Sequence, residues 1–261
     1  IPPSCSKSSI VSVLLPAWVW TWQPSASFLY QTYSQNLTLR DAAACRRLIE
    51  TDWYQQRWPH VEFESDDNQK GYYRTTSGGW RLSTTRGGRA TGEHPSFFVS
   101  DDGLSVDQAG SKLEREEWKR WYRETVSTRG IARDGTHIIA QQRLHPDDPS
   151  SVALEENRAA ESAGDAIPWH HVRLPMRYEP STAMVDRGFG ADWRTTEGEL
   201  LYPQLLDESK MKAIERALGP RASRAQLQQD PVHSAGQMFA VDKLIERTIP
   251  IESLPKMDRV V

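Results

Sequence analysis

The chain has 261 residues, of which 38% are hydrophobic and 26% are charged, and its formal net charge is −3. These values are typical of one large globular α/β domain or two small ones, with enough apolar residues for a sizeable core. Because acidic and basic residues nearly balance, a globally basic surface is excluded, and any nucleic acid would be held by a local patch.

Cysteine usage and hydropathy exclude further classes. Cys5 and Cys45 lie outside any CxxC or Cys/His spacing, which argues against a zinc site and a disulfide framework and fits a reducing compartment. The longest apolar stretch, residues 10–22, is broken by polar residues and is too short to span a bilayer. The first residue is Ile1 and no signal sequence is recognisable, so we expect a piece of a longer protein.

The first predicted helix covers residues 7–15. Its apolar residues recur on one helical face: Ile10, Val11 and Leu14. Pro16 is expected to end or kink this helix, because proline lacks the N–H that an inner helical turn needs. Residues 27–34, rich in β-forming side chains, are predicted to form a strand.

A second helix is expected where Thr38 and Asp41 form an imperfect capping box. Its buried stripe would consist of residues at helical spacing, namely Ala42, Cys45, Leu48 and Ile49. Residues 72–76 and 80–84 flank a Ser-Gly-Gly turn, which predicts a β-hairpin. A loop over residues 85–92 then leads to a short apolar strand at residues 97–99.

Ser111 and Glu114 form a capping box that opens a third helix. Several large apolar residues are expected in the core: Trp18, Leu113, Trp118, Trp121 and Tyr122. Residues 137–140 and 172–174 are predicted strands, and residues 206–229 a helix with a break at Gly219-Pro220. Strands separated by helices predict a mostly parallel α/β sheet flanked by helices.

The segment Ser4-Cys5-Ser6-Lys7-Ser8-Ser9 runs directly into the first helix. A nucleoside triphosphate needs backbone N–H groups that point inward, a lysine for the outer phosphates and a hydroxyl that binds magnesium. Lys7 and Ser8 supply the last two, so the segment is predicted to be a phosphate-binding loop, with Ser8 as a magnesium ligand. The alternative is a serine-rich helix cap with an exposed lysine.

Asp101 and Asp102 end the strand at residues 97–99. Open α/β sheets bind metal and substrate at the carboxyl ends of their strands. Asp101 is predicted to bind Mg²⁺, while Asp102 orients or deprotonates the attacking water. The alternative is a solvated Asp-Asp-Gly turn.

The strand near residue 137 ends in Gln142 and Arg143. Gln142 could sense the γ-phosphate and Arg143 could transmit that signal, whereas the alternative is an ordinary polar strand exit. Arg86 and Arg89 flank glycines in the loop at residues 85–92, which suits a phosphate contact from DNA or nucleotide, or simply a flexible hairpin exit.

These three motifs occur in the order of an additional-strand P-loop NTPase: a Lys-Ser helix start, a strand ending in two acids, and a strand ending in a polar sensor. This order predicts that Lys7 faces Asp101 and Asp102 across a gap that fits Mg²⁺ and a triphosphate.

Short segments along nearly the whole chain together resemble the large subunit of tailed-phage terminases. They are Pro16-Ala17-Trp18, Tyr33-Ser34, Arg46-Arg47-Leu48-Ile49, Trp53-Tyr54-Gln55, the glycines of residues 87–92, Asp101-Asp102, Gln142-Arg143-Leu144-His145, Asp147-Asp148, Leu174-Pro175 and residues 226–231. The resemblance implies an ATP-hydrolysing motor that moves double-stranded DNA into proheads in the host bacterial cytoplasm. Its partners would be the small terminase subunit, the portal protein and further copies in a ring.

The resemblance also implies roles and boundaries. Residues 4–9 would bind ATP, Ser8 and Asp101 would bind Mg²⁺, and Asp102 would stand where many motors have a catalytic glutamate. Residues 1–175 would form the ATPase core with a truncated first strand, residues 176–255 a small helical or irregular lid or linker, and residues 256–261 the start of an RNase H-like nuclease whose metal-binding acids lie further on. This chain is therefore expected to lack nuclease activity.

Two departures from the family pattern concern the loop. Ser4 stands where the family has arginine and Ser6 where it has glycine, which puts ATP turnover in question. The alternative function is a non-catalytic assembly module that binds DNA, the small subunit or the portal. A metal nuclease that uses Asp101 and Asp102 is a third interpretation, and it needs more acids than this segment offers.

Overall fold

A computed structural model describes residues 1–88, 92–127, 135–182, 184 and 190–232. Residues 1–231 form one unit by their contacts. The expected start of a nuclease strand at residues 256–261 lies outside the described residues. Within the described part of the chain, no helix combines the length and the apolar character that crossing a bilayer requires.

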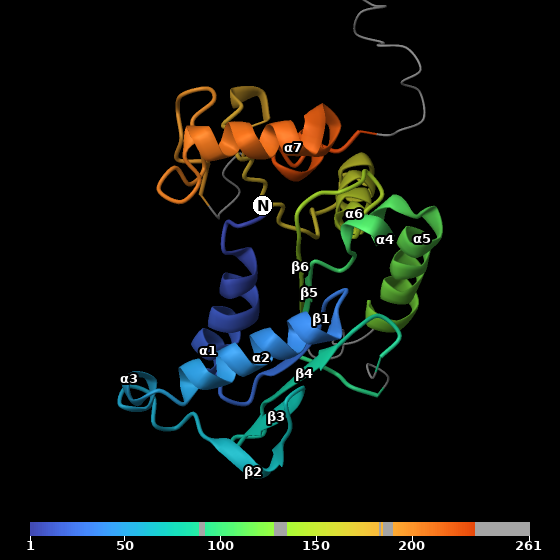
Figure 1. Cartoon of the computed structure of the whole chain (residues 1–261). Coiled ribbons are helices and arrows are strands. Elements are labelled where there is room, and N and C mark those ends of the chain that lie inside the picture. The colour runs from blue at the N-terminus through green and yellow to red at the C-terminus, as the bar shows by residue number, and fades with distance from the viewer. Residues whose placement is uncertain (89–91, 128–134, 183, 185–189, 233–261) are drawn as a thin grey trace, which may run out of the picture. The chain divides into compact units, whose positions relative to one another are not determined.

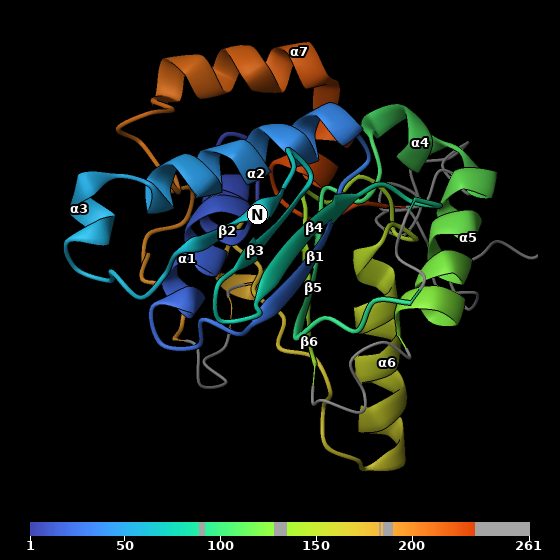
Figure 2. The same ribbon diagram turned by 90° about the horizontal axis from the view of Figure 1, so that it is seen from below.

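A six-stranded sheet is the centre of the fold, in the order β2-β3-β4-β1-β5-β6 (Figures 1 and 2). Its strands are β1 (Ser27–Gln31), β2 (Phe63–Asn68), β3 (Tyr72–Thr75), β4 (Trp80–Thr84), β5 (Phe97–Asp101) and β6 (Thr136–Ala140). Strands β4, β1, β5 and β6 run parallel, and the β2-β3-β4 edge is antiparallel. The predicted hairpin is β3-β4, while β2 was not predicted and residues 172–174 are not a strand.

Helices cover both faces of this sheet, which confirms the predicted α/β architecture. The helices of the described residues are η1 (Ser9–Leu14), α1 (Leu15–Trp20), α2 (Gln35–Ile49), α3 (Asp52–Gln55), α4 (Val106–Gly110), α5 (Lys112–Trp121), η2 (Tyr122–Val126), α6 (Ser150–Ala163), η4 (Pro180–Thr182) and α7 (Glu208–Gln226). Figure 2 shows α1 and α2 on one side of the strands and α4, α5 and α6 on the other.

The alternation of side chains along β1 divides the core in two. Phe28 and Tyr30 belong to the cluster under η1, α1 and α2, whereas Leu29 belongs to the cluster under α4, α5 and α6. This is the two-residue period of a strand that is buried on both faces. A third, smaller cluster surrounds Met176, Met211 and Leu227, and the Cys5 side chain packs against it.

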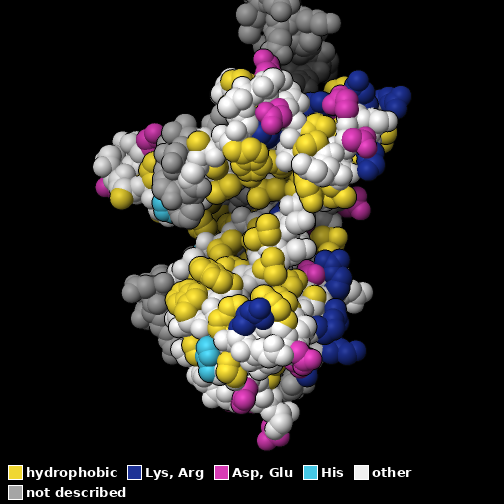
Figure 3. Space-filling view, turned by 90° about the vertical axis from the view of Figure 1, so that its left-hand side faces the viewer, with side chains coloured by type: hydrophobic (Ala, Val, Ile, Leu, Met, Phe, Trp, Pro, Cys, Tyr) yellow, Lys and Arg dark blue, Asp and Glu magenta, His cyan; other side chains and the backbone are white. Residues whose placement is uncertain are grey.

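The first helix differs from the prediction. It continues through Pro16 because its preceding turns, η1, have π geometry. The resulting rotation exposes Ile10 and Leu14, which are 53% and 49% exposed, and buries Ser12. Trp18, predicted to be in the core, is 61% exposed. Figure 3 shows hydrophobic side chains gathered on the face of the molecule that is turned towards the viewer.

The other predicted features of the helices agree in part with the structure. Helix α2 begins at Gln35, so Thr38 and Asp41 lie inside the helix and are buried rather than forming its cap. The Ser111 hydroxyl does accept the Glu114 N–H, as predicted for the start of α5. Leu113, however, is 62% exposed, because it lies on the outer side of that helix. The expected break in α7 is present at Gly219, where φ is 73°.

Candidate functional site

The Lys7 ammonium and the Asp102 carboxylate form the centre of the candidate site. Lys7 Nζ donates to Asp102 Oδ2 at 2.6 Å, although the two residues are far apart in the sequence. Lys7 is 9% exposed, so its charge is largely removed from solvent. The predicted facing of these residues is therefore present, but the predicted gap between them is not, because the ion pair closes it.

Asp101 lies beside this pair and receives two serine hydroxyls. Ser8 Oγ donates to Asp101 Oδ1 at 3.1 Å, and Ser12 Oγ donates to Oδ2 at 2.9 Å. Burial is the main cause that raises the pKa of Asp101 above its ordinary value, and the neighbouring Asp102 charge adds to it. Sequence reasoning missed Ser12, because a straight α-helix was assumed in this segment.

The loop before the helix has a strained backbone. Ser4 and Ser6 have φ values of 61° and 58°, in the left-handed region that favours glycine. Backbone that alternates between right- and left-handed residues can turn successive N–H groups to one side and bind an anion there. Glycine would adopt the φ of Ser6 without strain.

Asp102 and Gln229 complete the set of non-glycine residues with positive φ among the described residues, at 47° and 57°. Asp102 contacts Lys7, and the Gln229 side chain accepts the backbone N–H of Arg143, directly after Gln142. Asp102 and Gln229 therefore lie at the carboxyl end of the sheet, and Ser6 directly precedes the lysine that contacts Asp102. Strain of this kind is concentrated at functional sites, where the surrounding structure enforces it.

The two neighbouring strands hold the Asp102 backbone. Its N–H donates to Ala140 O at the end of β6 at 2.8 Å, and its carbonyl accepts from the N–H of Tyr33 after β1 at 3.0 Å. The Gln142 N–H donates to Asp102 Oδ1 at 3.3 Å. The Gln142 side-chain oxygen is buried and has no hydrogen-bond partner among the described residues. The predicted sensor thus touches Asp102 through its backbone.

A buried amide lies beneath the Asp101-Asp102 turn and was not predicted. Gln31 Nε2 donates to Gly103 O at 3.2 Å, and Gln31 Oε1 accepts from Ser100 Oγ at 2.7 Å and from Trp118 Nε1 at 3.3 Å. Gln31 is fully buried. Because each of these groups is satisfied only in this arrangement, the network fixes the path of the chain directly after the two acids.

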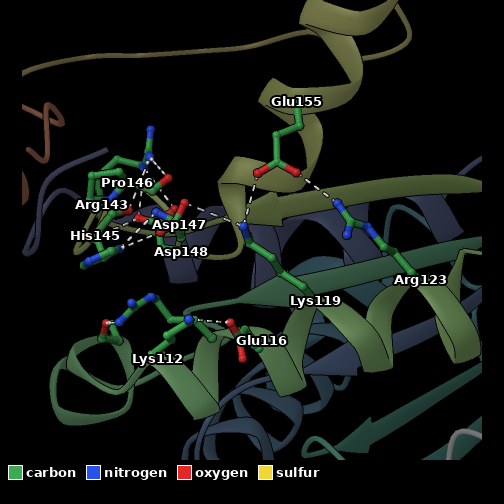
Figure 4. Close-up of polar contacts among 12 residues, drawn as sticks. Lys112, Glu116, Lys119, Arg123, Arg143, His145, Pro146, Asp147, Asp148 and Glu155 are labelled. Atoms are coloured by element: carbon green, nitrogen blue, oxygen red, sulfur yellow. Dashed lines mark hydrogen bonds and ion pairs between the residues drawn. The ribbon is translucent and has the colours of Figure 1, made fainter. Parts of the chain in front are cut away.

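Arg143 forms internal contacts rather than facing solvent. Its Nε lies 2.9 Å from Asp148 Oδ2, and this carboxylate also accepts the N–H of Leu144. Figure 4 shows the pair near Lys119 of α5, which contacts Asp147 and Glu155, while Arg123 contacts the same Glu155. The Arg143 guanidinium would have to leave Asp148 to reach a phosphate.

The Arg86 guanidinium is also engaged within the chain. Its Nη2 lies 2.6 Å from Glu114 Oε2 and 3.2 Å from Glu117 Oε2 on α5. A phosphate contact from Arg86 would require these ion pairs to open. Arg89 lies outside the described residues.

The groups that could hold a magnesium ion are few. Asp101, Asp102 and the hydroxyls of Ser8 and Ser12 are oxygen ligands of the kind that Mg²⁺ takes, and this donor set fits the ion. In the described part of the chain, no three or more His, Cys, Asp or Glu side chains cluster as a metal site. A nucleotide-associated ion needs only a hydroxyl and one acid from the protein, since the phosphates supply further oxygens.

A cavity of about 960 Å³ runs along β6 and is bordered by Lys7, Ile10 and Gln141.

The sheet, the helices on both faces and the Lys-acid cluster at the strand ends define an α/β protein with a candidate anion and cation site. No family model and no curated protein sequence matches the chain.

Proposed function

We propose that this site binds a magnesium–nucleoside triphosphate and hydrolyses it, and that the fold is a P-loop NTPase. The single observation that supports this best is the convergence of Lys7, Ser8, Asp101 and Asp102 within hydrogen-bonding distance, at the end of a strained loop that opens a helix. A lysine, a hydroxyl and paired acids are what triphosphate and Mg²⁺ require in such enzymes.

The path of the chain into the loop supports the additional-strand type. The backbone nitrogen of Ile1 donates to Gln141 O at 3.2 Å, so the chain approaches the loop beside the end of β6. β6 therefore lies between the entering chain and β5, which ends in the two acids. We propose that β6 is the additional strand of this type.

The residues of this chain would act as follows. Ser8 and Asp101 would hold Mg²⁺, which neutralises charge that develops on the phosphates. A triphosphate oxygen would compete with Asp102 for the Lys7 ammonium. Once released, Asp102 would be free to accept a proton from the attacking water, with Gln142 beside it. The ion pair of Lys7 and Asp102 is then the resting arrangement of the site.

The resemblance to terminase large subunits suggests what the hydrolysis drives. We propose that ATP is the nucleotide and that the chain is the motor part of a DNA-packaging enzyme, which works in the host cytoplasm with double-stranded DNA, the small subunit, the portal and further copies in a ring. Ser4, which replaces the family's arginine, removes a charge that stabilises the transferred phosphoryl group, so slow turnover is expected.

Hydrolysis measurements test this proposal. Wild-type protein should release phosphate from ATP only with Mg²⁺. Asp101→Asn and Asp102→Asn should each reduce the rate of release at least about a hundredfold. The exposed control Asp165→Asn should keep the wild-type rate. ATP binding without hydrolysis by the wild type would instead favour a non-catalytic assembly module. That alternative has one specific support, the serine residues at positions 4 and 6. Hydrolysis that survives Asp101→Asn would reject the assignment of the site.

A further inference from the structure

The π turns at the start of the first helix have a cause in the sequence. The N–H of Leu15 donates to the carbonyl of Ile10, five residues earlier, rather than to that of Val11. Pro16 follows and has no N–H. The carbonyls four and five residues before Pro16, those of Ser12 and Val11, therefore receive no bond from it, and buried carbonyls require another donor.

Two buried side chains of the sheet supply those donors. The Tyr30 hydroxyl donates to Val11 O at 2.7 Å, and Arg81 Nη1 donates to Ser12 O at 2.6 Å. Arg81 also lies over the Tyr30 ring, 3.8 Å from its centroid, and both side chains are fully buried. They come from β1 and β4, which pair with each other. Neither contact belongs to the candidate site as described above.

Ser12 contacts both Arg81 and Asp101. Its carbonyl accepts from Arg81, and its hydroxyl donates to Asp101 Oδ2. In a regular α-helix the side chain of residue 12 would be rotated relative to its place in the π turn. In this structure the hydroxyl meets the carboxylate from within the wider winding of the π turn. Hydrogen bonds of this kind orient a ligating carboxylate and set its affinity for a metal.

We propose that Tyr30 and Arg81 are positioning residues of the magnesium site, because they hold the π turn that Pro16 opens and thereby direct the Ser12 hydroxyl to Asp101. This inference deepens the proposed function and rests on it for the identity of the ion. The placement of Ser12 by Tyr30 is a separate structural claim that can be tested without any metal.

The test uses the affinity of the full chain for Mn²⁺, measured with ADP from the electron paramagnetic resonance signal of the free ion. Ser12→Ala should weaken binding about tenfold, as for other residues that orient metal ligands, and Tyr30→Phe should weaken it about threefold. The double variant should bind no more weakly than Ser12→Ala alone, because both changes remove the same contact. Arg81→Lys, which keeps a donor, should bind more tightly than Arg81→Met.

Tyr54→Phe is the matched control. Its hydroxyl donates to Ala17 O at 2.6 Å, beyond the π turn, so the variant loses a bond of the same type and should keep the wild-type Mn²⁺ affinity. Equal losses in Tyr54→Phe and Tyr30→Phe, or additive losses in the double variant, would overturn the proposal. If the wild type binds neither Mn²⁺ nor ADP, the proposed function fails. Crystal structures of Tyr30→Phe and Tyr54→Phe then decide the positioning claim, which requires the Ser12–Asp101 bond to be lost only in Tyr30→Phe.

Discussion

Ser6 illustrates how one side chain can limit this site. Its φ of 58° is a conformation that glycine adopts freely and that other residues adopt with strain. The folded loop keeps this strained conformation, and the next residue, Lys7, is held by its ion pair with Asp102. In the proposed nucleotide complex, the backbone at this position would approach a phosphate, and the Cβ of Ser6 would crowd it.

Ser6→Gly is therefore expected to strengthen nucleotide binding. The variant removes the strain and the Cβ, while the greater freedom of glycine in the unfolded chain offsets the gain in stability, so the free energy of unfolding should change by less than about 1 kcal/mol. Isothermal titration with ATP and Mg²⁺ should show a dissociation constant about three- to tenfold lower. Weaker binding in Ser6→Gly would show that the serine itself contacts the nucleotide.

Asp101 is expected to make the folded protein less stable as the pH rises. Burial and Asp102 raise the pKa of Asp101, so the folded state binds its proton more tightly than the unfolded state does. The Asp101 carboxyl group consequently opposes folding once it is charged. This destabilisation grows as the pH rises from the pKa of the unfolded state through the raised pKa of the folded state. At pH 8, the free energy of unfolding of Asp101→Asn should exceed that of the wild type by about 1 kcal/mol. The variant should therefore unfold at a higher denaturant concentration.

This difference between Asp101→Asn and the wild type should shrink towards pH 3, where both side chains are neutral. Urea titrations at several pH values measure it, with Asp165→Asn as the exposed control. A difference that grows on acidification would contradict the assigned direction of the shift in pKa.

At the level of elements, the turn after β5 depends on Gly103. A Cβ built on this residue would lie 2.7 Å from both Ser100 Oγ and Trp118 Nε1, closer than real Cβ contacts allow. Gly103→Ala should therefore disturb the network around Gln31 and lower the free energy of unfolding by about 2 kcal/mol. Gly110→Ala in α4, where a Cβ meets nothing within 4 Å, should be close to neutral. Equal stabilities of the two variants would show that the turn repacks easily.

The elements also show how much the sequence allowed us to predict. The hairpin, β5 and β6 were predicted because alternation, turn residues and apolar runs are local signals. The polar residues at their ends were then brought together by the topology of a parallel sheet, which places such ends at one edge. The convergence of Lys7 with Asp101 and Asp102 followed from this reasoning.

What could not be predicted depends on contacts between distant residues. The π turn requires donors from Tyr30 and Arg81, which no local pattern associates with Pro16. Ser12 therefore looked like an interruption of an apolar stretch, and the exposure of Ile10 and Leu14 was not foreseen. Gln31 looked like the polar end of a strand, although it holds the turn after the acids. The engagement of Arg86 by Glu114 was equally invisible, because it joins a loop to a helix.

For the whole molecule, we expect that the described chain does not cleave DNA. Two-metal nucleases require several convergent acids, whereas the candidate site offers two, Asp101 and Asp102. Supercoiled plasmid incubated with the protein and Mg²⁺ or Mn²⁺ should remain supercoiled. Cleavage that disappears in Asp101→Asn would contradict this expectation and assign a different reaction to the same site.

The central claim is that Lys7 exchanges Asp102 for a nucleotide phosphate. Isothermal titration of ATP into the wild type, Lys7→Ala and the exposed control Lys112→Ala, each with and without Mg²⁺, tests it most directly. We predict Mg²⁺-dependent binding by the wild type and Lys112→Ala, and a loss of at least about a hundredfold in affinity for Lys7→Ala. Equal affinity in all three proteins, or no binding by the wild type, would contradict the account.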